Sequence, residues 1–69
     1  MKKVKKILEA AAECIYNLKF LNGDESIKNI WRGKIQGLLE AAEIISGNSY
    51  DWDTDGIYEN SSNEPIIEC

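Results

Sequence analysis

The sequence predicts an all-α fold, in which an antiparallel helical hairpin assembles into a homo-oligomeric helical bundle and carries an acidic C-terminal tail. Two long segments, 2–21 and 25–46, repeat apolar residues at helical spacing, and a Gly-Asp pair separates them. Residues 1–46 hold eight bases and six acids (net +2), whereas residues 47–69 hold six acids and no base (net −6), which together give the formal charge of −4. We therefore divide the chain into a helical hairpin oligomerisation domain, 1–46, and an acidic aromatic tail, 47–69.

The first helix is expected over residues 2–21. When its residues are placed at steps of about 100°, the apolar side chains share one arc and the charged side chains share the opposite one. The apolar arc holds Val4, Ile7, Leu8, Ala11, Cys14, Ile15, Leu18 and Leu21. Gly23 suits a left-handed position after this helix, and Asp24 suits the N-cap of the next one.

The second helix is expected over residues 25–46, and Gly47 offers its stop. Its apolar arc spans about 200°, which is wider than the roughly 100° that a helix facing one neighbour needs. The arc takes in Ile27, Ile30, Trp31, Ile35, Leu38, Ala41, Ala42, Ile44 and Ile45. Because a short connection makes the two helices pack antiparallel, the first helix covers only part of this arc. We therefore expect self-association, with a symmetric dimer forming a four-helix bundle as the simplest closed arrangement and higher oligomers as alternatives.

Three small residues follow one line along the second helix. Gly33, Gly37 and Ala41 are spaced four residues apart, which lets another backbone approach closely. A glycine in a helix interior costs about 1 kcal/mol relative to Ala, so its presence needs a reason. We predict that another helix packs on this line, and we assign the three residues to oligomer packing.

Lys34 falls near the middle of the apolar arc. We expect its ammonium either to reach an edge of the arc or to meet an acid across an interface, since a buried unpaired charge is costly. The alternative is that Lys34 faces a ligand, together with the adjacent Trp31 and Arg32. Without a ligand, we expect Trp31 in the core and Arg32 in solvent.

The tail begins with a pattern that resembles the first half of a calcium loop. Asp51, Asp53 and Asp55 precede Gly56 as positions 1, 3 and 5 precede the glycine at position 6 of such a loop. The resemblance then fails, because position 12 is Ser62 instead of a bidentate Glu. We favour no metal and no cofactor, and we keep calcium binding through the three aspartates as an alternative.

The same residues also predict a short β-hairpin. Asp55-Gly56 is a strong signal for a two-residue turn, and aromatic residues alternate with aspartates over 50–54. This interpretation places Thr54 opposite Ile57. The alternative is an irregular or disordered acidic tail.

The mixture of aromatic and acidic residues in the tail is typical of a protein-binding segment. Aromatic side chains dominate interface hot spots, and carboxylates steer a segment towards a basic surface. The residues that we expect to bind a partner are Tyr50, Trp52, Asp53, Asp55, Tyr58 and Glu59.

Composition disfavours several classes of function. The chain has no histidine, no phosphate-binding glycine loop and no serine elbow, so an enzyme is the least supported class. The charge distribution disfavours direct binding to nucleic acid, because the tail would repel phosphates. No run of about 20 apolar residues is present, so we expect no membrane span. The two cysteines, Cys14 and Cys69, do not make a disulfide framework, which fits a reducing cytoplasm, so we expect a soluble, cytoplasmic protein.

Three functional hypotheses follow. The leading one is a small non-enzymatic interaction protein that self-associates through its helices and inhibits a partner protein, with its tail occupying a basic surface. Its size and its Lys-, Ile- and Asn-rich composition are typical of phage or mobile-element accessory proteins. The alternatives are an oligomeric binder of a small anionic ligand, such as a nucleotide, at a subunit interface, and a calcium-binding module.

Overall fold

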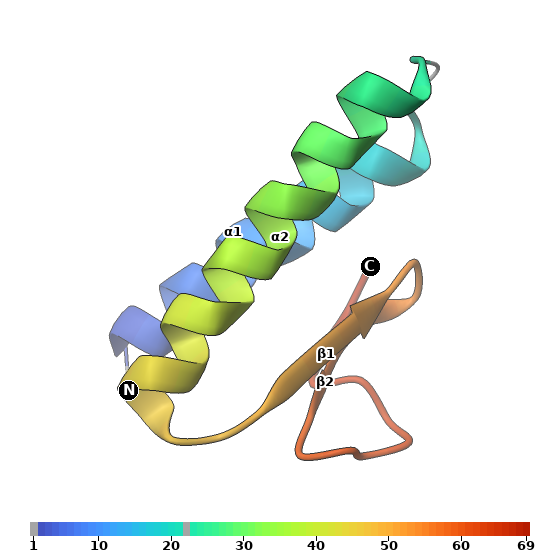
Figure 1. Cartoon of the computed structure of the whole chain (residues 1–69). Coiled ribbons are helices and arrows are strands. Elements are labelled where there is room, and N and C mark those ends of the chain that lie inside the picture. The colour runs from blue at the N-terminus through green and yellow to red at the C-terminus, as the bar shows by residue number, and fades with distance from the viewer. Residues whose placement is uncertain (1, 22) are drawn as a thin grey trace.

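The computed structural model describes residues 2–21 and 23–69, with only the backbone of Lys2. It contains two helices and one antiparallel sheet, namely α1 (Lys2–Lys19), α2 (Glu25–Ser46), β1 (Tyr50–Asp53), β2 (Gly56–Glu59) and β3 (Ile67–Glu68). The helices form an antiparallel hairpin, and the strands lie against one part of its length (Figure 1). The longest dimension is 34 Å, which is about the length of α2 at 1.5 Å per residue.

The end of α1 differs from the prediction at Gly23. The last turn tightens, because the Phe20 amide donates to the Asn17 carbonyl at 3.2 Å and the Leu21 amide donates to the Leu18 carbonyl at 3.3 Å. These bonds span three residues and satisfy carbonyls that a helix end leaves open. Gly23 is not among the residues with positive φ, so the left-handed stop predicted there is wrong.

Both ends of α2 lie where the sequence predicts them. Asp24 is the N-cap, and its Oδ1 accepts a hydrogen bond from the Ile27 amide at 3.1 Å. Gly47 is the C-cap, with φ of +77°, and its amide donates to the Glu43 carbonyl at 2.8 Å. A glycine adopts this left-handed conformation without the cost that a Cβ would add.

The tail is ordered as a sheet with the strand order β1-β2-β3. In the β1–β2 pair, Trp52 lies opposite Ile57 and Asp53 lies opposite Gly56. The turn therefore centres on Thr54 and Asp55. A hairpin in this segment is confirmed, whereas the predicted register, with Thr54 opposite Ile57, is wrong.

The reason for this register lies in the Asp53 side chain. Its Oδ1 accepts a hydrogen bond from the Asp55 amide at 2.8 Å, which closes the turn one residue earlier than Asp55-Gly56 would. Asp55 has no positive φ, although a type I′ turn on the Asp55-Gly56 pair would require one at both of its central positions. An aspartate at the first position and a glycine at the fourth instead favour a type I turn.

The third strand extends the sheet beyond the hairpin. Ile67 of β3 pairs with Ile57 and Glu68 pairs with Gly56. The Ile66 amide donates to the Ile57 carbonyl at 2.7 Å, and the Cys69 amide donates to the Asp55 carbonyl at 2.9 Å. These bonds cover the edge of β2 that faces away from β1.

The helices and the sheet share one core. Its buried members are Val4, Leu8, Ala11 and Ile15 from α1, Ile35, Leu39 and Ala42 from α2, and Tyr50 and Ile57 from the sheet. The sheet is fastened to the end of α2 by polar contacts as well, because the Tyr50 amide donates to Glu43 Oε2 and the Tyr50 hydroxyl lies 3.1 Å from Ser46 Oγ.

The predicted helical hairpin is therefore present, and the prediction of an all-α chain was too narrow because the tail adds a small antiparallel sheet. Neither helix has a stretch long and apolar enough to cross a membrane, as judged over the described residues.

Candidate binding surfaces

A stripe of residues on α2 faces away from both α1 and the sheet. We call it the α2 stripe, and its members are Ile27, Ile30, Lys34, Gly37, Ala41 and Ile44. All three of its isoleucines are exposed: the exposed fraction is 43% for Ile27, 61% for Ile30 and 84% for Ile44. The core residues of α2 lie on the other side of the helix, so folding of one chain leaves this apolar surface uncovered.

The two glycines of α2 are not explained by contacts within the chain. A Cβ added to Gly33 or to Gly37 would meet no atom within 4 Å. Neither α1 nor the sheet approaches them within that distance, so the helix packing predicted along this line is not made within one chain. An alanine in place of each glycine would stabilise the helix by about 1 kcal/mol. The isolated chain therefore gives no reason for a glycine at either position.

Lys34 and Trp31 form a pair on the surface. The Lys34 ammonium lies 4.8 Å from the centroid of the Trp31 ring, within the range of a cation–π contact. Trp31 is half-buried and lies outside the core cluster, so its predicted position in the core is wrong. Its ring instead contacts the Lys34 ammonium, which the apolar side chains of the α2 stripe do not pair with.

The sheet separates the predicted partner-binding residues onto two faces. Tyr50 is only 8% exposed and belongs to the core, and Trp52 is half-buried against the core. Directly opposed residues share a face, so Glu59 lies on the helix-facing side with Tyr50. The opposite face carries Asp51, Asp53 and Tyr58, which we call the acidic face.

The turn completes this acidic face. Asp55 is exposed in the turn. The Tyr58 hydroxyl donates a hydrogen bond to Asp53 Oδ1 at 3.2 Å. Desolvation raises the pKa of Tyr58, and the hydrogen bond to Asp53 and the charges of Asp53 and Asp55 act in the same direction. The aromatic ring and the carboxylates thus form one polar surface on the outside of the sheet.

The aspartates of the calcium-like pattern occupy a strand and a turn instead of one continuous loop. Asp51 and Asp53 are in β1, and Asp55 lies in the turn. Within the described part of the chain, no three acidic or cysteine side chains gather closely enough to hold a metal ion.

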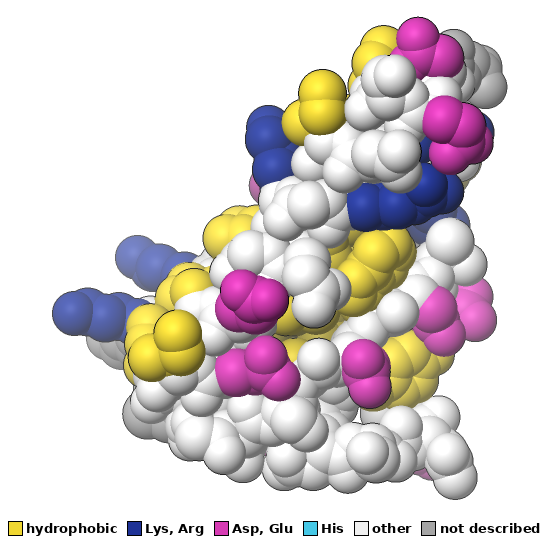
Figure 2. Space-filling view, in the orientation of Figure 1, with side chains coloured by type: hydrophobic (Ala, Val, Ile, Leu, Met, Phe, Trp, Pro, Cys, Tyr) yellow, Lys and Arg dark blue, Asp and Glu magenta, His cyan; other side chains and the backbone are white. Residues whose placement is uncertain are grey.

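A groove lies between the β1–β2 turn and the half of the helical hairpin that is near the α1–α2 connection. Its volume is about 460 Å³, and its lining comes from three parts of the chain: Leu18 and Lys19 of α1, Lys28 and Arg32 of α2, and Trp52, Asp53 and Thr54 of the hairpin. Figure 2 shows Lys and Arg side chains beside an apolar floor in the hollow between the helices and the sheet. Three cations and one acid give the lining a net charge of +2, although the whole chain carries −4.

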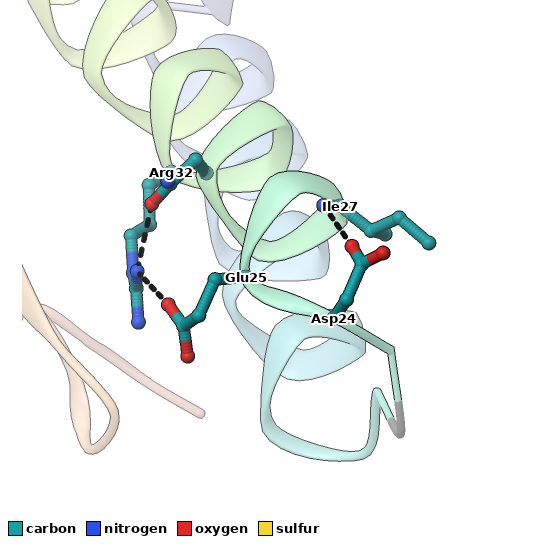
Figure 3. A network of polar contacts seen from close by, with 5 residues as sticks. Asp24, Glu25, Ile27 and Arg32 are labelled. Carbon is teal, nitrogen blue, oxygen red and sulfur yellow. Dashed lines mark hydrogen bonds and ion pairs between the residues drawn. The ribbon is translucent and has the colours of Figure 1, made fainter.

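Arg32 is held in place on the wall of this groove. Its guanidinium donates to Asn29 Oδ1 at 2.9 Å and to Glu25 Oε2 at 3.3 Å. Figure 3 shows Arg32 and Glu25 together on one side of α2, with the Asp24 cap close by. The ion pair with Glu25 is well exposed, so it contributes little stability and leaves the guanidinium open to competition by another anion.

The groove was not predicted from the sequence. Of the three residues that the sequence predicts to face a ligand, Arg32 lines the groove, whereas Trp31 and Lys34 lie elsewhere on α2. Leu18, Lys19 and Lys28 were missed, because their spacing along the chain carries no recognisable motif. Comparison of the chain with protein-family models, with characterised proteins and with solved structures found no match.

Proposed function

We propose that this chain is a non-enzymatic interaction protein that acts as a homodimer and uses its acidic face to bind and inhibit a partner protein. The observation that carries the proposal is the α2 stripe, an exposed apolar surface that runs along most of the longest helix. A 69-residue domain with a small core gains stability by covering such a surface with a second copy.

The spacing of the α2 stripe suits an antiparallel pair of helices. Its members follow intervals of 3, 4, 3, 4 and 3 residues, which is the spacing of facing positions in a coiled coil. Antiparallel pairing around the middle of the stripe sets Ile27 opposite Ile44 of the second copy. It sets Ile30 opposite Ala41, and Lys34 opposite Gly37. The larger side chain of each unequal pair meets a smaller one, which gives the exposed glycine a role.

The charges of α2 favour the antiparallel direction over the parallel one. Residues 25–35 carry one acid and three bases, a net charge of +2, and residues 36–46 carry two acids, a net charge of −2. An antiparallel pair brings each positive half against a negative half, whereas a parallel pair brings like charges together. This arrangement also supplies the acid that Lys34 was expected to meet across an interface, since Glu40 lies in the negative half.

The acidic face supports the partner-binding part of the proposal. Asp51, Asp53 and Tyr58 lie on the side of the sheet that no helix covers, and Asp55 is exposed beside them. Carboxylates around an aromatic ring suit a surface rich in Lys and Arg, where they raise the association rate. A dimer presents two such faces, so it can occupy an extended basic surface and block it.

The dimer is tested by light scattering at micromolar concentration. Ile44→Glu places a charge at the most exposed position of the stripe, where it leaves the folded monomer intact and prevents association. Gln36→Glu is the matched control, because it adds the same charge at an exposed position of α2 outside the stripe. We expect two chains per particle for the wild type and for Gln36→Glu, and one chain for Ile44→Glu. A monomeric wild type would overturn the proposal.

The acidic face is tested by neutralising it without changing its shape. Asp51→Asn, Asp53→Asn and Asp55→Asn together remove three charges and keep the oxygen that caps the turn. We expect the triple variant to lose a partner that the wild type captures, and salt to weaken that capture. If both proteins bind the same partners equally well, the acidic face is not the recognition surface.

A further inference from the structure

We propose that the groove between α1, α2 and the β1–β2 turn binds a small planar anion of nucleotide size, with its ring against Trp52 and its anionic group among Lys19, Lys28 and Arg32. This inference goes beyond the proposed function and does not rest on it, because one chain builds the whole groove.

The positive lining is the first support. Lys19, Lys28 and Arg32 come from two helices and converge on one hollow of an acidic protein. Arg32 and Lys19 are held there by hydrogen bonds, the latter to the Cys69 backbone oxygen at 3.0 Å. In the described part of the chain, Arg32–Glu25 is the one pair of oppositely charged side chains within ion-pair distance, so no acidic side chain there pairs with Lys28.

The one acid of the lining is already engaged. Asp53 Oδ1 accepts hydrogen bonds from the Asp55 amide and the Tyr58 hydroxyl on the turn side. These bonds hold the carboxylate in place at the turn. The lining therefore attracts an anion overall, and its attraction is strongest on the helix side of the groove.

The apolar floor selects for a ligand with a flat body. Leu18 and Trp52 both pack against the core from the floor of the groove. The Trp52 indole thus lines the groove. Stacking of a planar ring on an indole tolerates rings of different types. The volume of about 460 Å³ lies within the range of roughly 300–1,000 Å³ that is usual for small-molecule sites.

The site differs from the nucleotide site predicted at a subunit interface. Arg32 belongs to both, but Trp52 takes the place of Trp31, and Lys19 and Lys28 take the place of Lys34. The α2 stripe and the groove lie on different faces of α2, so a ligand in the groove does not need a second copy of the chain.

AMP is the probe that we would use, with adenosine and inorganic phosphate as its two separated parts. The full-length chain, labelled with ¹⁵N, is titrated at low salt while the Trp52 indole and the Thr54 amide signals are followed. We expect saturable shifts with AMP, and affinity at least about tenfold above that for either part, because both parts are held at once. If adenosine binds as tightly as AMP, the anion site is refuted; if phosphate does, the stacking site is refuted.

Two variants locate the binding. Lys28→Gln removes a cation from the groove, and we expect it to weaken AMP binding about five- to tenfold. Lys5→Gln removes the same charge from the exposed face of α1, outside the lining, and should leave the affinity unchanged. The amide spectra report whether each variant is folded. Absence of saturable shifts at millimolar AMP, or an equal loss in both variants, would overturn the inference. Ile44→Glu should still bind AMP saturably, because one chain builds the whole groove.

Discussion

Among the five glycines of the chain, Gly56 is the one at which an added methyl group would meet the closest contact. Its φ of +154° is a backbone conformation that L side chains rarely adopt. A Cβ added to it would overlap the Ile67 carbonyl oxygen and would lie 3.1 Å from Pro65 Cβ. The obstacle is backbone of the neighbouring strand, so no side-chain rotation relieves it. Gly56→Ala must therefore either strain β2 or move β3 away.

Both responses cost stability. An L residue held in such a conformation costs about 1–3 kcal/mol. Moving β3 away breaks the hydrogen bonds from Ile66 to Ile57 and from Cys69 to Asp55, at about 0.5–1.5 kcal/mol each. We expect Gly56→Ala to lower the free energy of unfolding by about 2–4 kcal/mol, which is most of what a core of this size supplies.

Thermal unfolding followed by circular dichroism measures this effect. For a chain of this size, each kcal/mol corresponds to a shift in Tm of roughly 4–8 °C. Gly33→Ala is the control, because the same substitution there meets open space and should raise stability by up to about 1 kcal/mol. If Gly56→Ala stays within about 0.5 kcal/mol of the wild type, as ordinary surface substitutions do, the packing of β3 on β2 is not as described.

Three further predictions concern stability. Asp24→Ala removes the acceptor of the Ile27 amide and should cost about 1 kcal/mol in urea denaturation, whereas Asp24→Asn should cost much less. Ile35 is fully buried, so Ile35→Ala should cost about 2–5 kcal/mol and Ile35→Val about 0.5–1.5 kcal/mol by the same measurement. Burial raises the pKa of the Cys69 thiol, with Lys19 opposing the shift and Asp53 adding to it. The folded state thus holds this proton more tightly than the unfolded state, so stability is fully present below the ordinary thiol pKa and falls as pH rises through the raised one. In Tm measured against pH, Cys69→Ser should show a smaller alkaline decline than the wild type; equal declines would contradict the assignment.

The helices could be predicted because their signals are local. The apolar spacing, the Asp24 cap and the Gly47 stop all act within a few residues of the backbone that they shape. Gly23 misled the prediction for a similar reason. A glycine permits a left-handed turn but does not require one, and the chain closed the last turn of α1 with short hydrogen bonds instead.

The sheet shows where local signals compete. Asp55-Gly56 and Asp53 each favour a turn in the same five residues, and the two turns differ by one position. Sequence alone does not weigh an Asp53 side-chain hydrogen bond against the preference of an Asp-Gly pair. The contact of Gly56 with Ile67 adds a tertiary reason for the observed register, because that position must lack a Cβ for β3 to approach. The residues next to Gly56 in the sequence do not indicate that this position must lack a Cβ.

The groove could not be predicted, because its lining is assembled only by the fold. Lys19 follows Leu18, which packs against the core near the end of α1. Lys28 and Arg32 lie one turn apart on α2, with no aromatic residue of the groove nearby in sequence. Trp52 reaches them only because the hairpin folds back along the helices. In contrast, the α2 stripe could be predicted, since all of its members lie on one helix. That the tail also leaves it uncovered could not be predicted, because the tail could have packed on it; the tail packs on another side of α2.

The position of these two surfaces on one helix leads to a last prediction. The antiparallel dimer needs the positive half of α2, whereas an anion in the groove offsets the charges of Lys28 and Arg32 in that same half. Bound AMP should therefore weaken the dimer, and by reciprocity the dimer should weaken AMP binding by the same factor. The two surfaces are separated by the width of the helix, about 10 Å, which is close to the Debye length at 0.1 M salt. The coupling should thus stay below about fivefold at low salt and disappear at high salt. Dimer dissociation constants with and without saturating AMP, measured at both salt concentrations, test this; a stronger dimer in AMP would contradict the assigned roles of the charges of α2.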